Sequence, residues 1–184
     1  MSKHTMEMIL EYAKIFPQNA DMGSPTGSTA AKAVHKKGGQ YIVNAYFTSE
    51  EQIQELMQAG LNPLPMNSPR IIDGNTDFGI GSFIKLKRDV KDNIKTFENK
   101  GKEVVINYGG PVGVVNLTKG QDNKSWWSVE EDGLIGNGTR AMVQFEMYAD
   151  GSGLRLKNVG ITEHVPYEGS NSYNAEADEM FKVA

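Results

Sequence analysis

The segment from residue 139 to residue 165 constrains the fold more strongly than any other part of this 184-residue chain. From 139 to 148, apolar and polar residues alternate almost without exception, which is the two-residue period of a β-strand with one buried face. The sequence ADGSG follows at 149–153 and is a strong signal for a tight turn between two strands. The segment therefore predicts a β-hairpin, which places the chain among the β-rich folds.

The apolar positions change parity along the second strand of this hairpin. Leu154 and Leu156 share one face, but the apolar residues from Val159 onward share the other. One extra residue near Lys157 and Asn158 would return both sets to the same buried face. The sequence therefore predicts a β-bulge at this point.

Five further segments are predicted as strands from their alternation or from their β-branched and aromatic content. They are 6–16, 40–48, 79–89, 102–108 and 112–118, the last two being joined by a turn at 109–111.

One helix is predicted between Ser49 and Gly60. Ser49 followed three residues later by Gln52 fits a capping box, and Gly60 is a plausible end signal. Residues 19–39 contain few large side chains and are predicted to form a long mobile loop. Residues 168–184 are polar and acidic and are predicted to be a flexible tail.

Composition limits the chemistry available to the chain. Cysteine is absent, which excludes disulfides and cysteine-based metal sites and favours a reducing, cytoplasmic setting. His4, His35 and His164 lie far apart in different contexts and support neither a metal site nor a catalytic triad. No apolar run reaches the length that spans a membrane. We therefore expect one domain without cofactor or metal, and not an enzyme.

The strand at 79–89 carries the strongest binding signal. Phe83, Lys85 and Lys87 alternate on its outward face, with Arg88 beside them. Bases stack on aromatic rings while cations contact phosphates, so this pattern favours single-stranded nucleic acid. The alternative is that Phe83 faces the core and the lysines are an ordinary solvated face.

Charge distribution favours the binding interpretation. Residues 83–102 contain seven Lys or Arg against three acidic residues, a local net charge of +4 in a chain whose total is −4. Further aromatic candidates are Tyr12 and Phe16 on the first strand and the adjacent pair Trp126 and Trp127. Further phosphate-contacting candidates are Lys14, Lys36, Lys37, Arg140, Arg155 and Lys157.

The adjacent tryptophans cannot both enter one core from an extended segment, because neighbouring side chains on a strand point to opposite faces. We expect one ring of Trp126 and Trp127 to cap the end of the fold. The other is then a candidate stacking platform at the rim of a binding groove.

Residues 130–168 carry a recognisable pattern: acidic Asp132, a Gly-x-Gly step at Gly136 and Gly138, a strand, a glycine turn and a strand that begins Leu-x-Leu. In this pattern the chain resembles the single-stranded DNA-binding proteins of tailed bacteriophages. Residues 11–18 and 38–51 resemble the first two strands of that family.

The resemblance implies an all-β fold, a small five-stranded OB-fold barrel with one helix and long loops, over residues 1–167. It implies a protein that coats exposed single strands during phage replication and recombination with little sequence preference. It also implies a partner-binding acidic tail at 168–184 that contacts replication proteins such as a DNA polymerase or helicase, and it is compatible with a homodimer. The corresponding tail residues are Glu176, Asp178, Glu179 and Phe181, although the family's tails end in an aromatic residue and this chain continues to Ala184.

Two other classes of function fit the same pattern of strands. One is a phage structural or protein-interaction β-module, in which the aromatic faces contact other subunits. The other is a β-barrel hydrolase that assembles its site from scattered acids such as Asp73 and Asp132.

Overall fold

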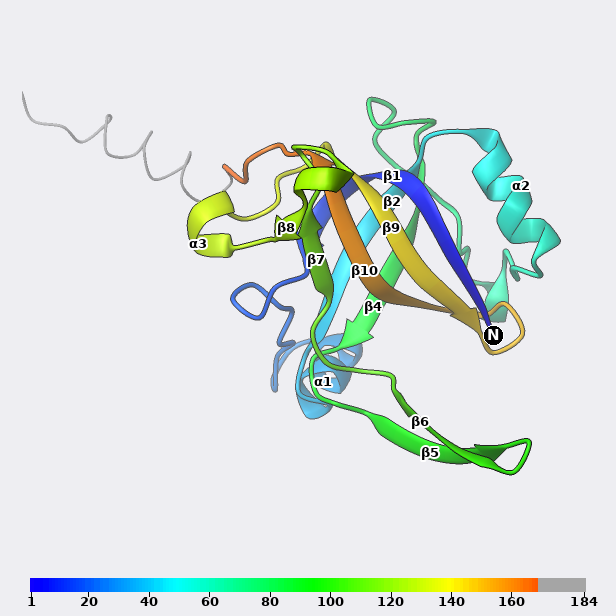
Figure 1. Cartoon of the computed structure of the whole chain (residues 1–184). Helices are drawn as coiled ribbons and strands as arrows, with labels where there is room; N and C mark the ends of the chain where they lie inside the picture. Colours follow the sequence, from blue (N-terminus) through cyan, green and yellow to red (C-terminus); the bar gives the residue numbers. More distant parts are fainter. Residues whose placement is uncertain (169–184) are drawn as a thin grey trace, which may run out of the picture.

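The computed structural model describes residues 1–168, and this part of the chain is mostly β (Figure 1). The described residues form one eight-stranded sheet, a separate two-stranded hairpin and three α-helices. The strands are β1 Ser2–Lys14, β2 Gln40–Phe47, β3 Ile72–Asp73, β4 Ser82–Asp89, β5 Ile94–Asn99, β6 Lys102–Asn107, β7 Gly113–Asn116, β8 Ser125–Trp126, β9 Thr139–Tyr148 and β10 Gly153–Glu163. The α-helices are α1 Thr29–Lys36, α2 Glu50–Gln58 and α3 Val129–Asp132, and short 3₁₀ turns lie at Pro65–Asn67 and Gln121–Asn123.

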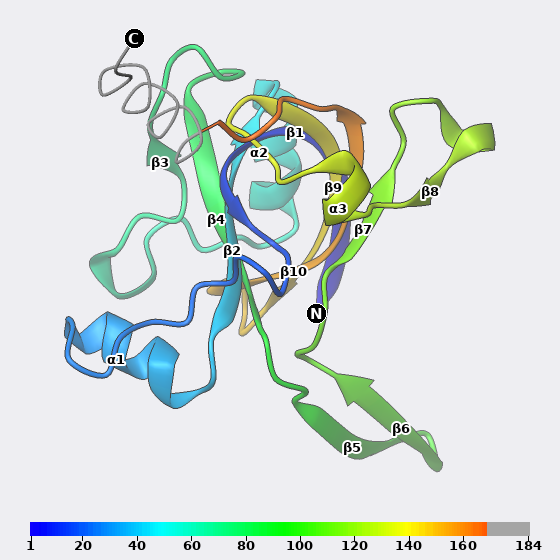
Figure 2. The same ribbon diagram turned by 90° about the vertical axis from the view of Figure 1, so that its left-hand side faces the viewer.

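The large sheet curls so that two of its strands meet. Its order is β3-β4-β2-β1-β9-β10-β7-β8, and β10 also pairs in parallel with β4 through Arg155 and Lys87. The run β4-β2-β1-β9-β10 therefore closes on itself, and we call it the strand ring. Figure 2 shows the ring nearly end-on, with the β5–β6 hairpin projecting away from it.

The core fills the inside of the strand ring. The apolar residues on one face of β9, which are Ala141, Val143, Phe145 and Met147, are buried as the alternation predicts. Leu154 and Leu156 at the start of β10 are buried as well. The pairing of β10 with β9 shifts between Leu156 and Asn158, so the predicted bulge is confirmed. Beyond the shift, Val159 and Ile161 return to the core.

The predicted helix is confirmed as α2, with one difference in its cap. Gln52 accepts a hydrogen bond from the backbone N–H of Thr48 at 2.8 Å, but Ser49 makes no side-chain capping bond. Gln52 therefore bonds the residue before the N-cap, and neither bond of the expected capping box is formed.

The prediction of one long loop over 19–39 is wrong, because α1 lies within it. The Ser28 hydroxyl accepts the N–H of Ala31 at 3.2 Å and caps the helix. The sequence TAAKAVHK consists largely of good helix formers, and the lack of large side chains reflects a helix that buries none of its residues.

The strands predicted at 102–108 and 112–118 both form, but they belong to different sheets. The first becomes β6 and pairs with β5, a strand that was not predicted. The second becomes β7 and pairs in parallel with β10. The glycine turn at 109–111 thus connects the projecting hairpin to β7, which lies beside the strand ring (Figure 1).

Candidate nucleic-acid interface

A cleft of about 600 Å³ lies on the outer side of β4. Residues of β4 line the cleft together with residues from the end of α1, the loop before β3 and the turn between β9 and β10. Six of these lining residues are cationic and one, Asp89, is anionic. The cations are Lys37, Arg70, Lys85, Lys87, Arg88 and Arg155. A chain of net charge −4 therefore gathers positive charge in one concave place.

The strand registers align three of the predicted cations across the sheet. Lys14 on β1 lies opposite Ile42 on β2, Ile42 lies opposite Lys87 on β4, and Lys87 lies opposite Arg155 on β10. Directly opposite residues project from the same face of a sheet. Lys14, Lys87 and Arg155 therefore form a cationic row across four strands, with Lys85 next to it.

Lys87 is surrounded by other cations that lower its pKa. Although Lys87 is exposed, partial desolvation in the cleft lowers its pKa, and the positive charges of Lys85, Lys37 and Arg70 lower it further. Like charges held close together repel, and an anion placed between them relieves the repulsion. The arrangement therefore favours a ligand with several negative charges.

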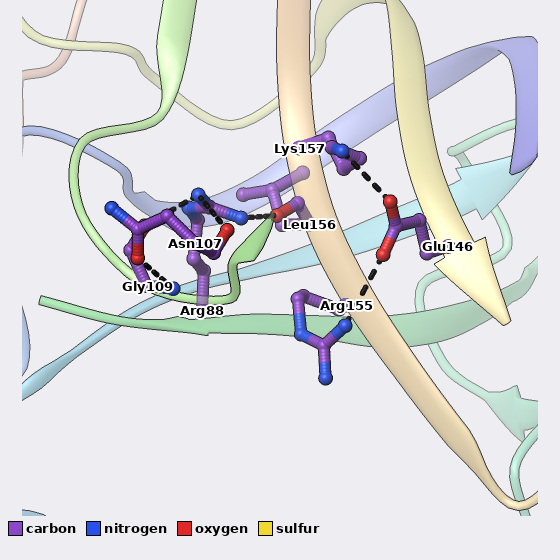
Figure 3. A network of polar contacts seen from close by, with 7 residues as sticks. All are labelled: Arg88, Asn107, Gly109, Glu146, Arg155, Leu156 and Lys157. Carbon is purple, nitrogen blue, oxygen red and sulfur yellow. Dashed lines mark hydrogen bonds and ion pairs between the residues drawn. The ribbon is translucent and has the colours of Figure 1, made fainter. Parts of the chain in front are cut away.

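Arg155 is held in place by aromatic rings and a carboxylate. Its guanidinium carbon lies 4.4 Å from the ring centroid of Tyr108 and 4.2 Å from that of Tyr148. Its Nη1 lies 3.1 Å from Oε2 of Glu146, whose other oxygen is 2.7 Å from Nζ of Lys157 (Figure 3). Two tyrosine rings and a carboxylate therefore fix the position of Arg155 in the lining of the cleft.

Glu146 is 3% exposed, and its ionisation is coupled to folding. Burial alone would raise the pKa of its carboxyl, but the hydrogen bonds and charges of Lys157 and Arg155 bring the pKa below the ordinary value of 4.5. A lowered pKa in the folded state contributes stability that is fully present above pH 4.5 and is lost as the pH falls through the folded pKa.

We predict that the pH dependence of stability below pH 4.5 becomes shallower in Glu146→Gln, because that variant has no carboxyl to protonate. Urea denaturation at a series of acidic pH values measures this, with exposed Glu50→Gln as the matched control. Equal slopes for wild type and Glu146→Gln would contradict the coupling.

Arg88 was predicted to contact phosphate, and the structure gives it a different use. Its Nε donates to the carbonyl of Gly110 at 2.9 Å. Its terminal nitrogens donate to the carbonyls of Asn107, Gly109 and Leu156 (Figure 3). The guanidinium thus bridges the 109–110 turn and β10. Its donors are occupied within the protein, so Arg88 is removed from the set of phosphate contacts.

The two phenylalanines predicted to stack on bases are buried. Phe83 does project from the outer face of β4, but it is 7% exposed, because Tyr46 packs on it at 4.9 Å between ring centroids and Ile72 and Phe78 cover the same cluster. Phe16 is 6% exposed and packs in the main core. Neither ring has a free face for a base.

The remaining predicted residues divide between the cleft and other surfaces. Lys37 reaches the cleft and pairs with Asp89 at 2.9 Å. Lys36 is exposed at the end of α1, and Tyr12, at the β1 bulge, is 65% exposed. Arg140 lies in a different hollow, where it pairs with Glu7 and Glu163 at 3.2 Å each.

The tryptophan pair divides as expected, but neither ring lines the cleft. Trp127 packs against the core, donates from Nε1 to the carbonyl of Gly133 at 2.9 Å and meets His164 edge-on. Trp126 is 77% exposed beside a shallow apolar hollow that also contains Phe16. One ring of the pair, that of Trp127, therefore packs on the core, and the other is exposed.

We predict that Trp126→Phe removes most of the fluorescence that iodide quenches, whereas Trp127→Phe retains this quenchable fluorescence. Trp127→Phe should instead lower the free energy of unfolding by about 1–2 kcal/mol, because a hydrogen bond and packing are lost. Iodide quenching and urea denaturation of the two variants measure these effects. Equal quenching of both variants would contradict the division.

Three contributors to the site were missed by sequence reasoning. Arg70 comes from an irregular loop, and Tyr108 and Tyr148 come from strand ends. The alternation of 139–148 placed Tyr148 on the outward face, which was the one available signal. Nothing local indicates that residues 70 and 108 approach β4 and β10.

No family model and no curated protein matches this chain.

Within residues 1–168, no group of three or more His, Cys, Asp or Glu side chains gathers as a metal site. Among the described helices none is long and apolar enough to cross a membrane. Asp132 accepts the N–H of Ser128 at 2.9 Å and so contributes to the cap of α3. The predicted tail residues at 176–181 lie outside the described part of the chain.

Proposed function

We propose that this protein binds single-stranded DNA, with little sequence preference, in the cationic cleft beside β4. The observation that carries the proposal is that Lys37, Arg70, Lys85 and Lys87, with Arg88 set aside, line one cleft together with Arg155, whose guanidinium is held by two tyrosines. Cations along a groove track a phosphate backbone, and planar groups inside it accept stacked bases.

The order of strands supports assignment to the OB-fold. The ring contains five long strands, in which the second and third in chain order, β2 and β4, are neighbours. OB-folds bind oligonucleotides on the face of their second and third strands, between the loop after the first strand and the loop between the last two. Here those loops are 15–39 and 149–152, and the cleft contains Lys37 from the first and Tyr148 beside the second.

The shape of the site favours a single strand over a duplex. Bases inside a duplex are stacked and their faces are out of reach, whereas bases of a single strand can lie on the ring of Tyr148, which lines the cleft. Coating of exposed strands during replication and recombination is the role that such binding would serve.

Titration of a labelled oligo-dT, followed by fluorescence anisotropy at several salt concentrations, tests the proposal. We expect binding that weakens linearly on a log–log plot, with a slope of about −0.7 for each phosphate contacted. Competition by unlabelled duplex of equal length should be weaker. Absent binding at low salt, or binding indifferent to salt, would refute the proposal. The alternative of a protein-interaction module would then be favoured.

A further inference from the structure

The β5–β6 hairpin, residues 94–107, projects from the strand ring beside the cleft, and we call it the arm (Figure 2). We propose that one face of the arm is a second contact surface for the DNA strand that occupies the cleft. The inference rests on the proposed function and extends it by a surface that a longer strand would reach.

The arm does not contribute to the core. In the described structure its two strands pair with each other and lie outside the large sheet. Every residue of β5 is exposed, and those of β6 are exposed or half-buried. A two-stranded hairpin alone is at best marginally stable in water, so contact with a ligand would stabilise this one.

One face of the arm is continuous with the cleft. Asn93 lines the cleft, the N–H of Tyr108 donates to its carbonyl at 2.9 Å, and the ring of Tyr108 stacks on Arg155. Side chains alternate along each strand, so the face that begins with this pair continues outward. Its members are Lys95, Phe97 and Asn99 on β5 and Lys102, Val104 and Ile106 on β6.

The two faces of the arm differ in charge. The cleft-side face carries Lys95 and Lys102 and no carboxylate, with the ring of Phe97, 41% exposed, between them. The opposite face carries Glu98 directly opposite Glu103. Only the cleft-side face suits a polyanion, and it repeats the combination of cations and an aromatic ring that single strands require.

The base of the arm is fixed relative to the cleft. The side-chain oxygen of Asn107 accepts the N–H groups of Asn93 and Gly109, each at 3.0 Å, and its amide donates to Asp92 at 2.9 Å. From this base, six residues of strand at about 3.3 Å each extend about 20 Å. A short DNA strand confined to the cleft does not reach Phe97, whereas a longer DNA strand does.

Oligonucleotide length therefore separates the two surfaces. We compare oligo-dT of about 6 and about 20 nucleotides, which bracket the site sizes of OB-folds. For the longer strand, Phe97→Leu should weaken binding at least about 5-fold through lost stacking. The double variant Lys95→Ala/Lys102→Ala should lower the salt slope by about 1.4, since each phosphate contact contributes about 0.7. For the shorter strand both variants should match wild type.

The controls distinguish failure of the arm from failure of the cleft. Val105→Thr, on the opposite face, should change neither affinity. Lys85→Ala/Lys87→Ala, in the cleft, should weaken both lengths. The inference would be overturned if the arm variants bound both the short and the long oligo-dT with wild-type affinity. It would also be overturned if Val105→Thr lost as much affinity for the long oligo-dT as the arm variants do. The sedimentation coefficient of the arm variants without DNA gives a further test. If it changed while the affinity for DNA stayed the same, the arm would be a contact between subunits and the inference would be overturned. Absence of binding by wild type would overturn the proposed function itself.

Discussion

Replacing Lys85 and Lys87 together with alanine is expected to weaken oligo-dT binding roughly 30-fold, because each lost lysine–phosphate contact costs about 1 kcal/mol. Both side chains are exposed on the outer face of β4 and line the cleft. The salt slope should fall by about 1.4 at the same time. Fluorescence anisotropy at several salt concentrations measures both quantities.

A matched control removes the same charge elsewhere. Lys3 and Lys119 are exposed and are not among the residues that line the cleft. Lys3→Ala/Lys119→Ala should therefore bind nearly as wild type does, and both double variants should retain the stability of wild type. Equal weakening by the two variants would mean that net charge, and not the cleft, governs the affinity.

Arg88→Ala is expected to lower the free energy of unfolding by about 3–5 kcal/mol, because hydrogen bonds from a charged donor to four backbone carbonyls are lost together. The carbonyls of Gly109 and Gly110 belong to buried residues and would lack a partner. Urea denaturation measures the loss.

Arg88→Lys tests whether geometry or charge is responsible. A lysine keeps the charge but cannot reproduce the planar fork, so it should recover only a small part of the lost stability. Under conditions where Arg88→Ala is folded, its affinity for a short oligo-dT should stay within a few-fold of wild type. Full stability combined with a large loss of affinity would contradict the structural role and restore Arg88 as a phosphate contact.

Local patterns were sufficient for the strands that form the core. The alternation at 139–148 and the change of parity after Leu156 predicted the hairpin and its bulge, because a strand's buried face depends on its own two-residue period. The outward direction of Lys85 and Lys87 followed from the same period on β4. These features need no knowledge of distant residues.

The errors arose where distant segments cover or occupy a side chain. Phe83 lies on the predicted face, but β3 and Phe78 fold over it, and nothing within 79–89 indicates that cover. Arg88 is occupied by carbonyls some 20 residues further along the chain. Arg70 reaches the cleft from an irregular loop whose path is set by tertiary packing.

Binding of DNA in the cleft can be mapped by backbone amide chemical-shift changes in the ¹⁵N-labelled protein on addition of a short oligo-dT. We predict shifts concentrated at Lys37, on β4 from Lys85 to Asp89, and at Tyr148 to Arg155. The amide of Trp126, outside the cleft, should be unaffected. Shifts confined to the β7–β8 hairpin around Trp126, with β4 unchanged, would contradict it.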